Sequence, residues 1–156
     1  MVSSGNLVPH PVQMTEVVLT ELSAKAGAAP NEEEPLGAEV KIEVQTEASS
    51  ETLGFASLVV DAAGQQDKGS IFSFRCRIKG RFEAPRGGTA QQLETFLKRS
   101  AVTLLLPFAR ETLSNITARM GLPPLILPLI DARATIQALV DQPISRAGSD
   151  AGGQPE

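Results

Sequence analysis

Apolar and polar residues alternate along the first half of the chain, a pattern that predicts β-strands. From Glu39 to Gln45 the alternation is strict, which indicates a strand with one face toward the core. Over residues 72–82 aromatic and aliphatic side chains fall on one face and basic side chains on the other. Residues 12–23 and 53–62 are rich in apolar and β-branched residues and predict two further strands. Because turns join consecutive strands, the pattern favours an antiparallel sheet.

The period then changes and predicts a long amphipathic helix. Apolar residues recur mostly at three- and four-residue steps from about Thr89 to Met120. Thr89 and Gln92 have the spacing of a capping box, and Gly121 suits the position just after a helix C-terminus. Pro107 lies inside the pattern. It is expected to kink the helix or to begin its second half, because it removes one backbone hydrogen bond and clashes with the preceding turn.

An apolar connector follows, and then a short helix. Residues 122–130 combine three prolines with apolar side chains, which excludes a regular helix and predicts an extended loop. Asp131 is expected to cap the short final helix. The predicted fold class is α+β: a four-stranded antiparallel sheet, a long kinked helix, an apolar crossover loop and a short lid helix. Residues 1–11 are expected to form a flexible lead, residues 12–142 the folded domain and residues 143–156 a disordered tail.

Composition and charge narrow the class of protein. The chain has 156 residues, of which 42% are apolar and 21% charged, as in a soluble globular domain. Its net charge of −4 argues against nucleic-acid binding, which needs basic surface. The single cysteine excludes an intramolecular disulfide and fits a cytoplasmic location. The N-terminus lacks the features of a signal peptide and no apolar run could span a bilayer, so no membrane insertion is expected.

Candidate catalytic and metal-binding residues are few and scattered. His10, the single histidine, lies between two prolines in the lead, where no fixed partner is expected. Cys76 falls on the apolar face of the fourth strand, where a thiol is usually an inert small hydrophobe. No spacing of histidine, cysteine and carboxylate residues suits a metal site. We therefore predict that the protein is not an enzyme and needs no cofactor.

A basic stripe occupies the other face of the fourth strand. One interpretation is a binding site for an anionic partner. The interpretation that we favour is a solvent-facing surface paired with acidic residues of a neighbouring strand, because exposed strands often carry charge for solubility. The stripe comprises Arg75, Arg77, Lys79 and Arg81, and the acidic neighbours expected on the second strand are Glu39, Glu43 and Glu47.

Apolar surface on the connector and on the long helix exceeds what one subunit is expected to cover. Loops normally lie at the surface, so the connector either packs into its own core or leaves an apolar interaction site. The long helix is apolar on two sides. A helix of this kind must be covered on both, here by the sheet and by another subunit.

Two segments resemble the SecB export chaperones. Residues 104–111 read LLLPFARE and residues 122–125 read LPPL. The family carries an N-I-L-F-P-Y-A-R-E segment followed by a proline-containing crossover loop, and the LPPL form also resembles SecB-like chaperones found beside toxin–antitoxin pairs. The resemblance covers residues 12–142. It implies a homotetramer, a dimer of dimers with the long helices between two sheets, and the implied interface residues are Leu97, Ala101, Leu105, Phe108 and Thr112.

The same resemblance implies an ATP-independent holding chaperone that keeps non-native polypeptides, such as secretory precursors, competent for translocation. The alternatives are a chaperone dedicated to one partner, such as an antitoxin, and a small-molecule or lipid carrier. The client groove would be formed by the second strand, the connector and the final helix. The residues implied are Val40, Ile42, Val44, Leu122, Leu125, Leu127, Leu129, Ile136 and Leu139.

The resemblance also implies docking of the translocase motor ATPase. In the family, acidic residues on the first and fourth strands make this contact, and Glu21 and Arg77 occupy such positions here. Lys25 and Arg77 are basic where the family carries acids. The charge of this face is therefore reversed, which disfavours the familiar motor contact because like charges repel.

Overall fold

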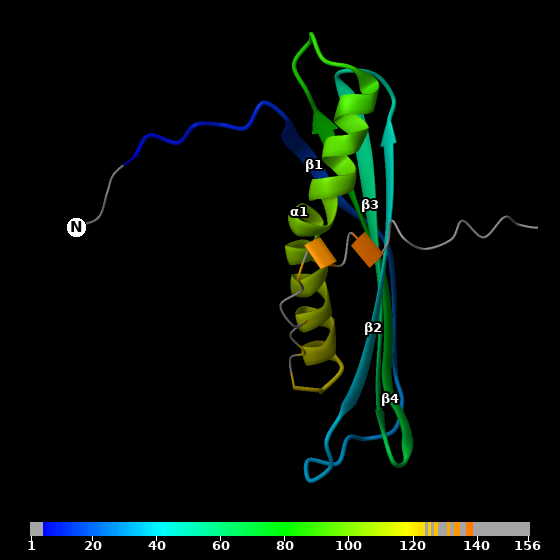
Figure 1. Ribbon diagram of the computed structural model, residues 1–156. Coiled ribbons are helices and arrows are strands. Elements are labelled where there is room, and N and C mark those ends of the chain that lie inside the picture. Colours follow the sequence, from blue (N-terminus) through cyan, green and yellow to red (C-terminus); the bar gives the residue numbers. More distant parts are fainter. Residues whose placement is uncertain are drawn as a thin grey trace, which may run out of the picture.

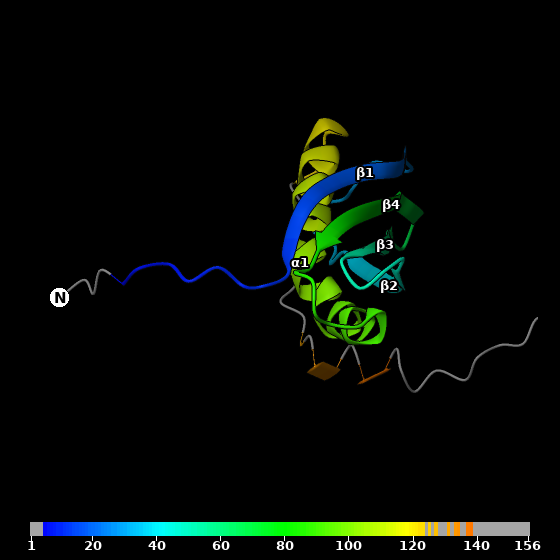
Figure 2. The same cartoon turned by 90° about the horizontal axis from the view of Figure 1, so that it is seen from above.

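One long helix lies across one face of a four-stranded antiparallel sheet (Figures 1 and 2). The computed structural model describes residues 5–123, 125, 127, 131, 133–134 and 137–138. In chain order the elements are β1 (Gln13–Ala26), β2 (Gly37–Ala48), β3 (Leu53–Gln66), β4 (Gly69–Glu83) and α1 (Ala90–Arg119). The strand order is β1-β4-β3-β2, so β1 and β2 are the two edges. The predicted α+β class and the order of strands before helix are confirmed.

β4 is an inner strand, and its two faces follow the predicted alternation. The aromatic and aliphatic side chains are buried beneath α1 at exposures of 4% or less; they are Phe72, Phe74, Cys76, Ile78 and Phe82. The basic side chains face the other way, where no element described in the structure covers the sheet (Figure 2). Hydrophobic burial on a single face therefore orients the whole sheet.

The neighbours of β4 differ from those that the sequence predicted. β4 pairs with β1 on one side and β3 on the other, while β2 lies at the far edge. The prediction that Glu39, Glu43 and Glu47 of β2 flank the basic stripe is therefore wrong. The flanking acidic residues come instead from β1 and β3.

Local chemistry determines both ends of α1. The Thr89 hydroxyl accepts a hydrogen bond from the backbone N–H of Gln92 at 3.1 Å, and the Gln92 side chain accepts one from the N–H of Thr89 at 3.0 Å. This is the predicted capping box. At the other end Gly121 has a φ of +77°, and the N–H of Leu122 donates to the carbonyl of Thr117. Both features define a Schellman ending, which confirms Gly121 as the residue after the helix.

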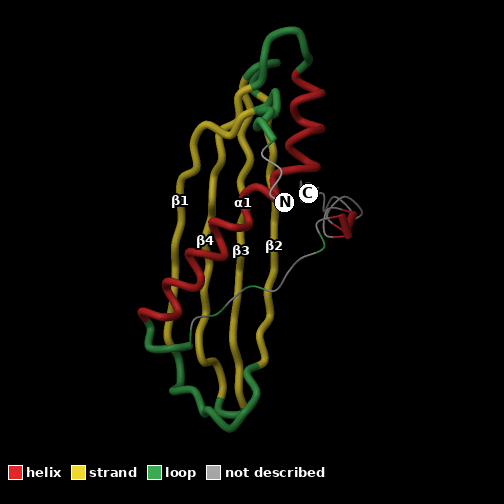
Figure 3. The backbone as a smooth tube through the Cα atoms, turned by 90° about the vertical axis from the view of Figure 1, so that its left-hand side faces the viewer, coloured by secondary structure: helices red, strands yellow, loops and turns green. Residues whose placement is uncertain are grey.

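α1 continues through Pro107 and is bent partway along (Figure 3). The missing N–H and the bulk of the proline ring account for such a bend. Two strand glycines let the helix approach the sheet closely. A Cβ at Gly54 would lie 2.8 Å from a methyl group of Leu97, and one at Gly80 would lie 2.9 Å from a methyl group of Leu105. Side chains at these positions would push the helix away.

The first part of the connector packs against its own chain. Leu127 is 2% exposed, and Leu122 and Leu125 are half-buried against the core. The hydroxyl of the buried Thr117 donates to the Leu113 carbonyl at 2.9 Å and accepts from the N–H of Leu125 at 3.0 Å. This bridge ties the connector to the last turns of α1.

Asp131 caps the helical residues that follow the connector, as predicted. One carboxylate oxygen accepts hydrogen bonds from the N–H groups of Arg133 and Ala134 at 3.0 and 3.1 Å. The described helical residues, 133–134 and 137–138, lie on the β2 side of the sheet (Figures 2 and 3).

Candidate functional site

A cavity of about 480 Å³ lies between one end of the sheet and the start of the connector. Buried Ile71 and Phe72 of β4 form its apolar floor. Leu122 and Leu125, two of the predicted groove residues, form one wall. The opposite wall comes from the β1–β2 loop, residues 27–36, together with Gln66 at the end of β3. A cavity of this size and character can take a large apolar side chain.

Gln66 holds the β1–β2 loop in place beside the cavity. Its side-chain oxygen accepts from the N–H of Asn31 at 2.9 Å, and its amide nitrogen donates to the carbonyls of Asn31 and Glu34 at 2.9 and 3.1 Å. The N–H of Asp67 donates to the Glu34 carboxylate at 3.4 Å. Glu32 and Glu34 line the cavity, so this loop supplies an acidic rim next to the apolar floor.

β2 forms the sheet edge on the same side as the described helical turns. Val40, Ile42 and Val44 point toward the helix side and are half-buried against the core, which confirms their predicted inward face. The β2–β3 register runs from Gly37 to Ala48 without a bulge. A regular edge strand of this kind presents unpaired backbone groups in an even row.

The other predicted groove residues have different positions. Leu127 lies beneath the surface in the core and does not line the cavity. Leu129, Ile136 and Leu139 lie outside the described residues. Sequence reasoning missed Ile71 and Phe72 as cavity residues, although their aromatic and aliphatic character at a strand end was visible.

The predicted interface residues of α1 divide into two groups. Leu97, Ala101 and Leu105 are at most 1% exposed and pack on the sheet of the same chain. They are already covered within one subunit, so they cannot offer surface to another. Phe108 is 37% exposed, and Thr112 is half-buried.

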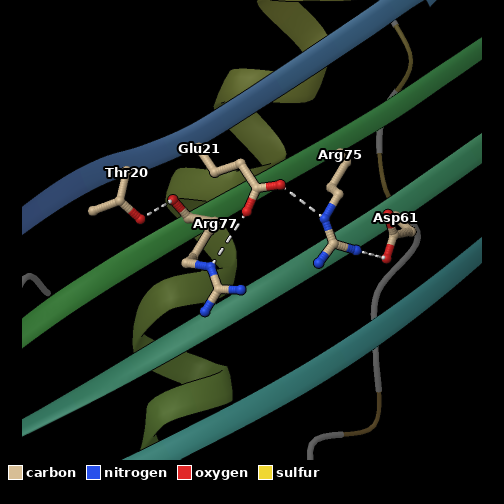
Figure 4. Close-up of polar contacts among 5 residues, drawn as sticks. All are labelled: Thr20, Glu21, Asp61, Arg75 and Arg77. Carbon is tan, nitrogen blue, oxygen red and sulfur yellow. Dashed lines mark hydrogen bonds and ion pairs between the residues drawn. The ribbon is translucent and has the colours of Figure 1, made fainter.

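The outer sheet face carries a network of ion pairs (Figure 4). Arg75 contacts Glu21 of β1 at 3.0 Å and Asp61 of β3 at 2.7 Å, and Arg77 contacts the second oxygen of Glu21 at 3.4 Å. The hydrogen bond from Arg75 is the main cause that lowers the pKa of Glu21. One of the two register shifts between β1 and β4 falls between Leu19 and Glu21, where the strand bulges.

The remaining basic residues of the stripe also have neighbours within the chain. Arg81 contacts Glu83 at 3.3 Å, and the Lys79 ammonium lies 4.6 Å from the centre of the Phe55 ring. The favoured interpretation of the stripe, internal pairing with acidic residues, is therefore confirmed for Arg75, Arg77 and Arg81, with partners other than those predicted. The two positions predicted for motor docking, Glu21 and Arg77, contact each other.

Other candidate chemistry is limited in the part of the chain that the structure describes. Burial raises the pKa of the Cys76 thiol to about 11, so it stays protonated at neutral pH. No cluster of three or more histidine, cysteine or acidic residues within the described ranges could hold a metal ion. Among the same residues, no helix combines the length and apolar character needed to cross a bilayer.

Comparison with known proteins places the chain in a family. The family model of preprotein translocase subunit SecB matches residues 9–142. Protein-export protein SecB of Zymomonas mobilis is 28% identical over 74% of this chain and 70% of its own length. Protein-export protein SecB of Ehrlichia chaffeensis is 33% identical over 50% of this chain. The matched region spans 49% of the length of that relative.

A solved structure shows the same fold. It is the SecB-like chaperone of Mycobacterium tuberculosis in complex with a ChAD peptide from the HigA1 antitoxin. The two chains superpose with a TM-score of 0.70 at 17% identity, covering 78% of this chain and 91% of that one. The family match over most of the sequence, the strand order and the long capped helix agree, and the chain belongs to the SecB family.

Proposed function

We propose that this protein is an ATP-independent holding chaperone of the cytoplasm that binds unfolded polypeptides, with secretory precursors as its clients. The observation that carries this proposal is the cavity between Phe72 and Leu125, which has an apolar floor and includes Leu36, the residue before the edge strand β2. Apolar client side chains entering it would gain about 25 cal/mol per Å² of buried surface. Backbone groups along β2 would add hydrogen bonds to an extended client.

Aggregation of an unfolded model protein tests the proposal directly. The purified chain, at a stoichiometric amount and without ATP, is expected to suppress light scattering by a denatured protein diluted into buffer. Scattering equal to that with the same mass of an inert protein would remove the proposal.

The acidic rim of the cavity favours clients that carry a basic residue next to an apolar one. Glu32 is exposed at the rim and close to the apolar floor. Exposed ion pairs contribute little, so the expected preference for a lysine-containing peptide over its glutamine analogue is about threefold at low salt. Glu32→Gln should abolish this preference, measured by fluorescence anisotropy, whereas Glu43→Gln on β2 should keep it. An unchanged preference in Glu32→Gln would show that the loop does not contact clients.

We further propose that subunits associate as a dimer of dimers through the outer side of α1. Leu104, Phe108 and Thr112 recur every four residues and so follow one side of the helix, and Phe96 lies eight residues before Leu104. All four are half-buried or exposed in a single chain. Their aromatic and aliphatic groups supply the apolar surface that the sequence predicted for a second subunit.

A chaperone dedicated to one partner protein is the second candidate. The ion pairs on the outer face favour it, because Arg75 and Arg77 already hold the Glu21 carboxylate that would meet the translocase motor ATPase. Capture of the motor by immobilised protein would support general export. Capture of a single other protein at stoichiometric yield, without the motor, would support the dedicated role.

A further inference from the structure

A second cavity, of about 570 Å³, lies beside the first half of α1, at the other end of the sheet from the β3–β4 turn. Met14 of β1, Phe82 of β4, and Phe96 and Leu104 of α1 contribute its apolar lining. Its volume is in the range of about 300–1,000 Å³ that is typical of binding pockets. The groove residues discussed above do not line it.

The N-terminal lead is anchored at the mouth of this cavity. The His10 ring stacks on Phe96 with ring centres 5.0 Å apart, and its Nδ1 accepts a hydrogen bond from the N–H of Val12 at 3.0 Å. The expectation that His10 lacks a fixed partner is therefore wrong. Proline follows and precedes His10, and proline favours an extended backbone at and before its own position. The lead accordingly runs away from the body of the protein (Figures 1 and 2).

Two solvent-exposed apolar side chains precede His10. Leu7 is 98% exposed and Val8 is 89% exposed, whereas the other exposed large apolar residues in the described ranges lie between 37% and 43%. Both residues point into solvent only a few residues from an apolar cavity. The lead extends away from the sheet and from α1 (Figure 1).

We propose that the lead is an exchanged arm, with Leu7 and Val8 of one protomer entering the cavity beside Phe96 and Leu104 of a second copy. The arm is apolar, and so is the part of the cavity that Met14, Phe82, Phe96 and Leu104 form, while Arg99, Ser100 and Thr103 give the rest of the lining polar groups. The apolar part suits the aliphatic side chains of the arm. Arm and cavity also lie at the same end of the protomer, so a two-fold arrangement brings each arm to the other copy's cavity. The half-exposed stripe that continues to Phe108 gives the second copy a matching surface on α1.

Disulfide trapping tests this arrangement in the full-length chain. Cys76→Ala removes the native thiol, and Leu7→Cys with Thr103→Cys then places one thiol on the arm and one at the cavity. Mild oxidation is expected to yield a covalent dimer on a non-reducing gel. A disulfide within one chain, seen as a monomer without free thiols, would overturn the exchange, and so would thiols that stay free. The matched control is Lys68→Cys with Thr103→Cys, because Lys68 lies at the opposite end of the sheet; it should give no dimer.

Self-association provides a second measurement that needs no cysteine. Leu7→Ser with Val8→Ser changes only side chains that are exposed in the protomer, so folding should be unaffected. Sedimentation equilibrium is expected to show a dissociation constant raised by about tenfold or more, because each symmetric pair loses two contacts. Asn6→Ser is the control and should leave the constant unchanged. A wild-type monomer at every concentration, or equal constants for wild type and variant, would disprove arm exchange, whatever the outcome of the chaperone assay.

Discussion

Replacing Leu122 and Leu125 together by glutamate is expected to abolish the holding of unfolded clients. Both side chains line the 480 Å³ cavity beside Phe72. The double variant loses apolar contact area and places carboxylates where client side chains would be buried. The combined loss is about 3 kcal/mol, or roughly 100-fold in the dissociation constant for a permanently unfolded model protein. Fluorescence anisotropy with a labelled, reduced and alkylated protein measures it.

Two controls separate this effect from unfolding. Leu122→Met with Leu125→Met keeps apolar volume and should retain binding, since such exchanges cost little. Val18→Glu adds a carboxylate at a site that is 42% exposed on β1, away from the cavity, and should also retain binding. If the double glutamate variant keeps the wild-type circular dichroism spectrum and still binds with wild-type affinity, clients do not use this cavity.

Leu105→Ala is expected to lower the free energy of unfolding by about 2–5 kcal/mol, the usual cost of a cavity in a packed core. Leu105 is fully buried between α1 and the sheet, close to Gly80. Phe108→Ala, only three residues further along the helix, should mainly affect the contact between subunits. It should weaken self-association and lower the unfolding free energy of the protomer much less.

Chemical denaturation and sedimentation, both at one fixed protein concentration, distinguish the two variants, because association itself adds to apparent stability. The contrast tests the division of α1 into an inner and an outer side. A Leu105→Ala protein of unchanged stability, or a Phe108→Ala protein of unchanged association, would contradict that division.

Patterns local in the sequence predicted most elements. Alternation over residues 72–82 predicted both faces of β4, because one face meets the helix and the other meets solvent. The cap at Thr89 and the end at Gly121 depend on contacts within a few residues, which the sequence displays directly. The sequence also predicted β1, but it indicated no buried face for this strand, because two bulges interrupt the period of two.

Contacts between distant segments could not be predicted in the same way. The strand order decides which acid meets Arg75, and local pattern does not determine whether β1 or β2 lies next to β4. The acidic rim of the cavity depends on the hydrogen bond between Gln66 and Asn31. These two residues are 35 positions apart in the sequence.

The sequence also left open which apolar side of the long helix faces the sheet. The family resemblance implied Leu97 and Leu105 as interface residues, whereas both pack on the sheet of their own chain. Gly54 and Gly80 carried the missing signal: bare backbone on a strand marks where a helix comes close, and the side chains opposite those glycines are the inner ones.

Arg75 has a mechanical consequence for the sheet. The Arg75 guanidinium on β4 forms ion pairs with Glu21 of β1 and Asp61 of β3. The two strands next to β4 are therefore joined to it by side-chain contacts as well as by backbone pairing. An edge strand usually separates from its sheet first, because it is paired on one side alone. Separating β1 from β4 would also break the ion pairs of Glu21 with Arg75 and Arg77, so these contacts add to the backbone pairing that holds this edge of the sheet.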